Sequence, residues 1–160
     1  MGKGKPVYLY AASGNKRLTK SGGEKQAMKK RILIVEDNPV HTRLIEMTLR
    51  SKNYTLLKAT SGEEALDIAT RERPDLILMD LNLPEMTGFE VTKKLRENPA
   101  FSHTPIIAIT AYAMRGDRER VIESGCDAYL TKPIDTRELP RVIAEMLLQR
   151  EKGSVEQQRG

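Results

Sequence analysis

The chain has 160 residues, the length of one domain with a short remainder, and its 39% hydrophobic fraction is enough to form a core. No apolar stretch is long enough to cross a bilayer or to serve as a signal peptide, so we expect a cytoplasmic protein without a membrane partner. The net charge of +5 is uneven, because residues 1–31 carry +8 and residues 32–148 carry −4, so overall basicity does not indicate nucleic-acid binding.

Residues 1–30 are rich in Gly, Lys and Ser and have one short apolar stretch, residues 7–10. We predict a basic flexible leader here, either native or an expression artefact, followed by a folded domain over residues 31–148. Residues 149–160 are predicted to form a polar C-terminal tail. A direct role in nucleic-acid binding would have to depend on the leader, which contains no recognisable module, and we expect none.

The regular pattern begins with a buried strand over residues 32–35, which ends in the acids Glu36 and Asp37. Asn38 is a suitable N-cap for the helix that follows, and Pro39 suits its first turn. Apolar residues at i, i+4 and i+7 spacing predict the buried face of this helix. These residues are Val40, Leu44 and Met47.

A mixed strand over residues 54–60 comes next, and its weaker apolar character predicts an edge position. Ser61 and Glu64 form a capping box that opens a second helix. The continuous apolar run of residues 76–79 then predicts a strand that is buried on both faces and ends abruptly in Asp80. A second capping box, opened by Thr87, begins a third helix.

The last third of the chain predicts two more strands and two more helices. A strand over residues 106–109 ends at Thr110, and a strand over residues 127–131 delivers Lys132 and Pro133, whose peptide bond we expect to be cis. A charged helix over residues 116–124 lies between them. The final helix begins near Asp135 and has an apolar stripe. The stripe consists of Leu139, Val142, Ile143, Met146 and Leu147.

Five strands alternating with five helices predict an α/β fold with a doubly wound five-stranded parallel sheet, because parallel strands need helical crossovers. The edge character of the second strand favours the order 2-1-3-4-5, as in flavodoxin-like three-layer folds. In that order the carboxyl ends of strands one, three, four and five lie side by side. They would bring together complementary polar side chains: Glu36, Asp37, Asp80, Thr110 and Lys132.

Three converging carboxylates repel one another unless a cation intervenes, and an all-oxygen acidic cluster suits Mg²⁺, with Mn²⁺ as the alternative ion. Lys132 would add a mobile positive charge and Thr110 a hydroxyl donor. A nucleophilic carboxylate, a metal and donors for the phosphoryl oxygens are what an in-line phosphoryl transfer needs. Taken singly, each residue is more readily explained as a strand-end residue, a surface amine or a solvated helix entry, so the case depends on four strands ending in complementary chemistry.

These stretches resemble the receiver domain of two-component response regulators, with a CheY-like fold. The resemblance covers residues 31–148 and rests on four segments that match the family pattern. These segments are residues 32–38, 75–88, 109–111 and 127–134. The sequence after Thr110 is closest in character to stand-alone cell-cycle receivers or to receivers of hybrid sensor kinases.

The resemblance implies that Asp80 accepts a phosphoryl group from a histidine kinase or a histidine phosphotransfer protein. It implies Mg²⁺ held by Asp37, Asp80 and the Asn82 carbonyl, with Glu36 acting through water. Lys132 would bind the phosphate, and Thr110 and Tyr129 would form the switch pair. The protein would catalyse only its own phosphorylation and dephosphorylation. With no output domain expected, it would signal through contacts with a downstream protein.

Two alternatives remain open at this point. The chain could be a receiver fragment of a hybrid sensor kinase. It could also be an aspartate-nucleophile phosphatase of the haloacid dehalogenase kind, although that chemistry normally needs a second acid where this chain has Asn82. A dinucleotide-binding domain is disfavoured, because Glu36 and Asp37 follow the first strand where a glycine-rich turn is needed.

Three further residues could carry chemistry by type. The single cysteine, Cys126, excludes an internal disulfide, fits a reducing compartment and is expected to be a small buried thiol. We expect His41, on the first helix, and His103, in a loop, to be surface residues, because neither has a second His or Cys nearby in sequence.

Overall fold

The apolar runs form one five-stranded parallel sheet in the computed structural model, which describes residues 28–111 and 116–159. The sheet order is β2-β1-β3-β4-β5, as the sequence predicts. The strands are β1 (Lys30–Val35), β2 (Tyr54–Ala59), β3 (Leu76–Asp80), β4 (Ile106–Thr110) and β5 (Ala128–Thr131). The helices are α1 (Pro39–Leu49), α2 (Gly62–Glu72), α3 (Gly88–Arg96), α4 (Asp117–Glu123) and α5 (Glu138–Arg159), with a short 3-10 helix, Pro99–Phe101.

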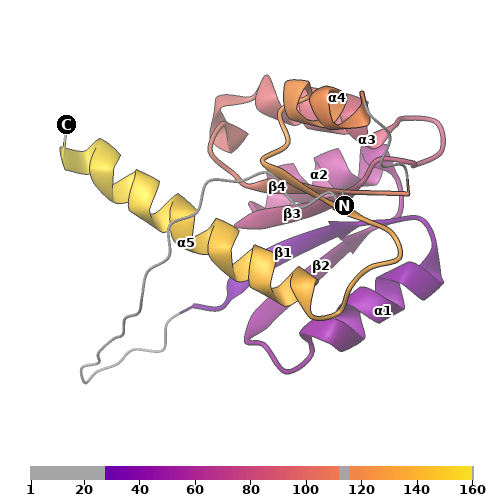
Figure 1. The fold of residues 1–160 in the computed structure, drawn as a ribbon. Helices are drawn as coiled ribbons and strands as arrows, with labels where there is room; N and C mark the ends of the chain where they lie inside the picture. The colour runs from indigo at the N-terminus through magenta and orange to yellow at the C-terminus, as the bar shows by residue number, and fades with distance from the viewer. Residues whose placement is uncertain (1–27, 112–115, 160) are drawn as a thin grey trace.

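Helices cover both faces of the sheet and enclose two separate apolar cores. Figure 1 shows α1 and α5 on one face and α2, α3 and α4 on the other. Because side chains alternate along a strand, each central strand contributes to both cores. In β3, Ile77 and Met79 belong to the core under α2 and α3, whereas Leu76 and Leu78 belong to the core under α1 and α5. This two-sided burial explains why the strands read as continuous apolar runs.

The predicted caps open the helices and fix where each one starts. The side-chain oxygen of Asn38 accepts a hydrogen bond from the Val40 N–H at the start of α1. Ser61 and Thr87 do the same for α2 and α3. Each cap satisfies a backbone donor that the helix itself leaves unpaired. These caps therefore fix the first turns of α1, α2 and α3.

The predicted buried face of α1 is wrong. Val40 is 72% exposed, Leu44 36% and Met47 54%, whereas Ile45 and Leu49 are fully buried. Both sets of residues have helical spacing, so periodicity predicts the helix but does not choose between its two apolar faces. The helix turns Ile45 and Leu49 toward the sheet, where they join the core that includes Ile32 and Ile34.

The apolar stripe predicted for α5 is confirmed, but the helix is longer than expected. It continues to Arg159, through the segment that was predicted to be a polar tail. Contacts with the sheet account for its first added turn. Arg150 donates from Nη1 to the Asp75 carbonyl (2.8 Å), and Glu151 pairs with Lys30 (3.1 Å). The predicted leader lies outside the described residues except for residues 28–30, and Lys30 begins β1.

Two aspartates join neighbouring strands at their amino ends. Asp75 precedes β3; its Oδ2 accepts the Arg31 N–H (2.8 Å), and its own N–H donates to the Arg31 carbonyl. Asp127 precedes β5 and pairs in the same way with Ile106. Its Oδ2 accepts the Ile106 N–H (2.9 Å), and its own N–H donates to the Ile106 carbonyl (2.8 Å). Each aspartate therefore makes a side-chain bond and a backbone bond to one residue of the adjacent strand. In the described part of the chain, no helix is both long and apolar enough to cross a bilayer.

Candidate phosphoryl-transfer site

Three carboxylates meet at the carboxyl ends of β1 and β3. Oxygen atoms of Glu36, Asp37 and Asp80 lie within 4.8 Å of one another. Glu36 and Asp80 are each only 2% exposed, whereas Asp37 is exposed. Glu36 is placed by its backbone, because its N–H continues the β1–β2 pairing and donates to the Ala59 carbonyl (3.0 Å). The structure therefore brings together the acids that the strand ends predict.

Lys132 supplies a cation to this cluster from the end of β5. Its Nζ lies 3.4 Å from Asp80 Oδ2 and 3.4 Å from Glu36 Oε1, and its side chain is 16% exposed. The Lys132 N–H donates to the Thr110 carbonyl (2.8 Å), which fixes the start of the loop after β5. The Lys132–Pro133 peptide is cis, so that prediction is confirmed.

The loop after β3 folds back against Asp80. The Asn82 N–H donates to Asp80 Oδ1 (2.9 Å), which holds the carboxylate in one orientation. The Gly88 N–H donates to the Leu81 carbonyl (3.3 Å), and a β-carbon on Gly88 would lie 2.4 Å from the Asp80 carbonyl oxygen. The position of Asn82 thus depends on how closely Gly88 approaches the end of β3.

Glu36 is a buried carboxylate with a raised pKa. Burial raises the pKa of its carboxyl above the usual value, against the opposing effect of the Asn38 N–H, and the nearby Asp80 charge raises it further. Its Oε1 is buried and accepts no hydrogen bond among the described residues, since Lys132 is near it only as an ion pair. A buried carboxylate oxygen without a donor fits a hydrated divalent cation.

Thr110 and Tyr129 lie on the adjacent strands β4 and β5, and both are buried, at 4% and 6% exposure. The Tyr129 ring belongs to the core under α2, α3 and α4. A cavity of about 480 Å³ opens next to Thr110, between the β3–α3 loop and α4. Asn82, Phe89, Asp117 and Arg120 are among the residues that line it. There is room beside Thr110 for its surroundings to rearrange.

His41 is a site residue that the sequence reasoning missed. Its Nδ1 lies 3.2 Å from Lys132 Nζ and 3.3 Å from Glu36 Oε2. We expected a surface residue because His41 has no second His or Cys nearby in sequence. His41 lies one helical turn before the buried Ile45 and shares its side of the helix, so the correct helix face would have pointed to it.

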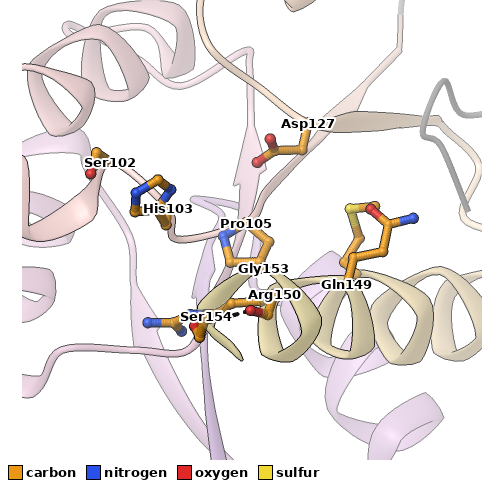
Figure 2. Close-up of a pocket in the computed structure, with 9 residues that line it drawn as sticks. Ser102, His103, Pro105, Asp127, Gln149, Arg150, Gly153 and Ser154 are labelled. Carbon is orange, nitrogen blue, oxygen red and sulfur yellow. Dashed lines mark hydrogen bonds between the residues drawn. The ribbon is translucent and has the colours of Figure 1, made fainter. Parts of the chain in front are cut away.

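A second cavity, of about 250 Å³, lies at the amino ends of β4 and β5 (Figure 2). The acidic cluster is at the opposite, carboxyl end of the sheet. The cavity is lined by His103, Asp127 and Arg150, among others. Its charged groups already serve structural contacts, since Asp127 pairs with Arg96 (2.8 Å) and Arg150 binds Asp75. The predicted buried thiol is confirmed, because Cys126 is 6% exposed and burial raises its pKa.

Comparison with known proteins identifies the class. The sequence profile of the response regulator receiver domain matches residues 32–144, so the chain belongs to this family. It is a phosphoacceptor switch of two-component signalling rather than a conventional enzyme, and a receiver of this kind implies a cognate histidine kinase. The predicted family and fold are therefore confirmed.

Among its relatives is the polar-differentiation response regulator DivK of Brucella anthropi, which is 47% identical over 116 residues. The match covers 72% of this chain and 92% of DivK. The receiver domain of the sensor histidine kinase PA1611 from Pseudomonas aeruginosa PAO1 is 40% identical, with a TM-score of 0.70 over 75% of this chain and 98% of that one. That structure has a magnesium ion coordinated in its active-site cleft. A CheY-like receiver from Methanospirillum hungatei JF-1 is 31% identical with a TM-score of 0.73, covering 79% and 99% of the two chains.

Proposed function

We propose that Asp80 is the phosphoacceptor of this receiver domain. The observation that carries the proposal is that Asp80 is buried at the end of β3, with Oδ2 3.4 Å from Lys132 Nζ and two further carboxylates within 4.8 Å. A carboxylate oxygen of Asp80 would attack the phosphorus of a phosphohistidine, forming an acyl phosphate as the P–N bond breaks. The histidine ring nitrogen leaves with the electron pair of that bond.

The surrounding residues would bind and orient the phosphoryl group. Lys132 would pair with one phosphoryl oxygen, and the Thr110 hydroxyl would donate to another. Asp37, Asp80 and the Asn82 carbonyl would hold Mg²⁺ or Mn²⁺, with Glu36 binding through water; the buried, donor-free oxygen of Glu36 supports this arrangement. When bound, the ion would neutralise the carboxylates and offset charge on the phosphoryl oxygens.

Phosphorylation of Asp80 is tested by intact-mass measurement after incubation with acetyl phosphate and Mg²⁺. The wild-type protein should gain one phosphoryl group, which hydroxylamine removes because it is an acyl phosphate. Asp80→Asn should gain none. Asp67→Asn changes an exposed aspartate on α2, and it should still gain one. A phosphoryl group on Asp80→Asn would place the acceptor elsewhere.

Metal binding should stabilise the fold by mass action. At an ion concentration 100 times its Kd, Mg²⁺ is expected to raise the free energy of unfolding by about 2.7 kcal/mol. Asp37→Ala should remove most of this gain in thermal unfolding. Glu97→Ala, which removes an exposed acid at the end of α3, should keep it. An unchanged Mg²⁺ response in Asp37→Ala would assign the ion to other ligands.

We further propose that Thr110 and Tyr129 form the switch. Phosphorylation would add about −1.5 to −2 charges beside Thr110, and the cavity on its α4 side leaves room for movement there. Thr110→Ala should therefore accept the phosphoryl group yet respond weakly across residues 116–132. Amide chemical shifts with and without beryllofluoride measure this response. Equal shift changes in both proteins would mean that the coupling follows another route.

The phosphoryl donor is proposed to be a histidine kinase or a histidine phosphotransfer protein, and the output a contact with a downstream protein. DivK and the receiver of PA1611 are both similar to this chain, which supports the two contexts of a separate response regulator and a kinase-linked receiver. The single cysteine, Cys126, is free and buried, which supports a cytoplasmic location. We propose residues 31–148 as the receiver, with residues 1–30 as a leader and residues 149–160 as an appended segment.

A further inference from the structure

The Lys132 ammonium is bordered by a third group besides the two carboxylates. His41 Nδ1 is its shortest polar contact, at 3.2 Å, against 3.4 Å to Asp80 Oδ2 and to Glu36 Oε1. We propose that His41 is a positioning residue that holds the Lys132 amine in place for phosphoryl transfer to Asp80. This inference deepens the proposed function and rests on it.

The fold of α1 directs the imidazole toward the site. Asn38 caps the helix, and the buried Ile45 sets the helix face that meets the sheet. His41, one turn earlier on that face, reaches across the end of β1 to Lys132 while its side chain remains 37% exposed. The contact joins α1 to the loop after β5, two segments that are 91 residues apart in sequence. Among the residues of α1, His41 is the one for which the structure shows a hydrogen bond with Lys132.

The proposed role requires one tautomer of His41. Nδ1 has a single site, so it either accepts a hydrogen bond from Lys132 or donates one to Glu36 Oε2, 3.3 Å away. If Nδ1 carried a proton, its N–H would face the Lys132 ammonium, and two hydrogen-bond donors would oppose each other. Glu36 Oε2 already accepts the Asn38 N–H at 3.1 Å, so it does not depend on the ring. An acceptor role for Nδ1 toward Lys132 therefore requires the ring to carry its proton on Nε2.

A neutral acceptor suits this task better than a third carboxylate would. Lysine has a flexible four-carbon stem, and holding its amine in advance removes an entropy cost from the reaction. When the phosphoryl group arrives, the N–H that faces Asp80 turns to a phosphoryl oxygen. The N–H that faces His41 keeps its partner, because the imidazole neither takes part in the transfer nor binds the ammonium as tightly as an anion does.

The test compares initial rates of phosphorylation by acetyl phosphate, a donor too small to need a docking surface. His41→Leu removes the acceptor and should slow the reaction about tenfold, the lower end of the scale for one lost hydrogen bond to a charged group. His41→Asn places its Oδ1 where Nδ1 lies and should restore a rate near wild type. In a Lys132→Ala background, His41→Leu should have no further effect, because the amine on which it acts is absent.

Nitrogen chemical shifts of the His41 ring add a readout that is independent of the reaction. They should show protonation at Nε2 only, and Lys132→Ala should shift the Nδ1 resonance. A protonated Nδ1, equal rates for wild type and His41→Leu, or an equal His41→Leu effect in the Lys132→Ala background would each overturn the role of His41. Failure of the wild-type protein to be phosphorylated on Asp80 would instead overturn the proposed function.

Discussion

Replacing Gly88 with alanine is expected to lower the free energy of unfolding by about 3 kcal/mol and to slow phosphorylation of Asp80. The new β-carbon would lie 2.4 Å from the Asp80 carbonyl oxygen, 2.8 Å from Leu81 Cα and 3.0 Å from the Asp80 carbonyl carbon. All three are backbone atoms, so relief requires moving either the start of α3 or the end of β3. Either movement displaces the Asn82 N–H that orients the Asp80 carboxylate.

Gly62→Ala is a matched control for this substitution, because Gly62 is likewise the first residue of a capped helix. Its β-carbon would meet the side chains of Val91 (2.7 Å) and Met86 (3.1 Å), which are able to shift. The loss there should be about 1 kcal/mol. Urea unfolding and acetyl phosphate kinetics measure both effects. Equal stability losses, with phosphorylation at the wild-type rate in Gly88→Ala, would show that the close approach at Asp80 does not control the site.

The second large effect is expected at Arg96, at the end of α3. Its guanidinium donates to the carbonyls of Phe101 (2.7 Å), Thr104 (2.8 Å) and Gly125 (2.9 Å), and it pairs with Asp127 (2.8 Å). Its side chain is only 19% exposed. Arg96→Ala removes all four contacts at once and should cost about 3 kcal/mol of unfolding free energy. Arg96→Lys keeps the charge but not the planar array of donors, so it should recover only part of the loss.

Arg71→Ala is the control for Arg96→Ala, because Arg71 pairs with Asp67 on an exposed face of α2 with 59% of its side chain exposed. Its loss should be about 0.3–0.5 kcal/mol. Urea titration of the three variants, at matched ionic strength, compares them directly. A similar loss in Arg71→Ala and Arg96→Ala would mean that the α3 end, the β4 entry and the β5 entry are not held together by Arg96.

The strand ends were predictable from the sequence because each apolar run stops at a polar residue. In a parallel sheet, such positions converge whatever the details of packing. This is why the sequence alone predicts that Asp80, Glu36 and Lys132 lie together. The sheet order was predictable too, since the mixed character of residues 54–59 suits only an edge strand.

The rotation of α1 about its axis was not predictable in the same way. The helix has two apolar faces, and only the packing of Ile45 and Leu49 on the sheet decides which one is buried. His41 lies on the same side of the helix as Ile45 and contacts Lys132 and Glu36, which the sequence alone did not indicate. The length of α5 was missed for a related reason. Arg150 appears in the sequence as a polar tail residue, yet its partner, Asp75, lies 75 residues away.

The aspartates at the amino ends of the strands, Asp75 and Asp127, bear on how the chain avoids misalignment as it folds. Both faces of the sheet are covered by apolar cores. Sliding β3 by one residue would therefore exchange its side chains between two apolar cores at little hydrophobic cost. The same slide would move Asp80 by about 3.3 Å and turn it to the other face. It would also break the paired bonds of Asp75 with Arg31. The alignment on which the acidic site depends is therefore enforced at the opposite end of the strands.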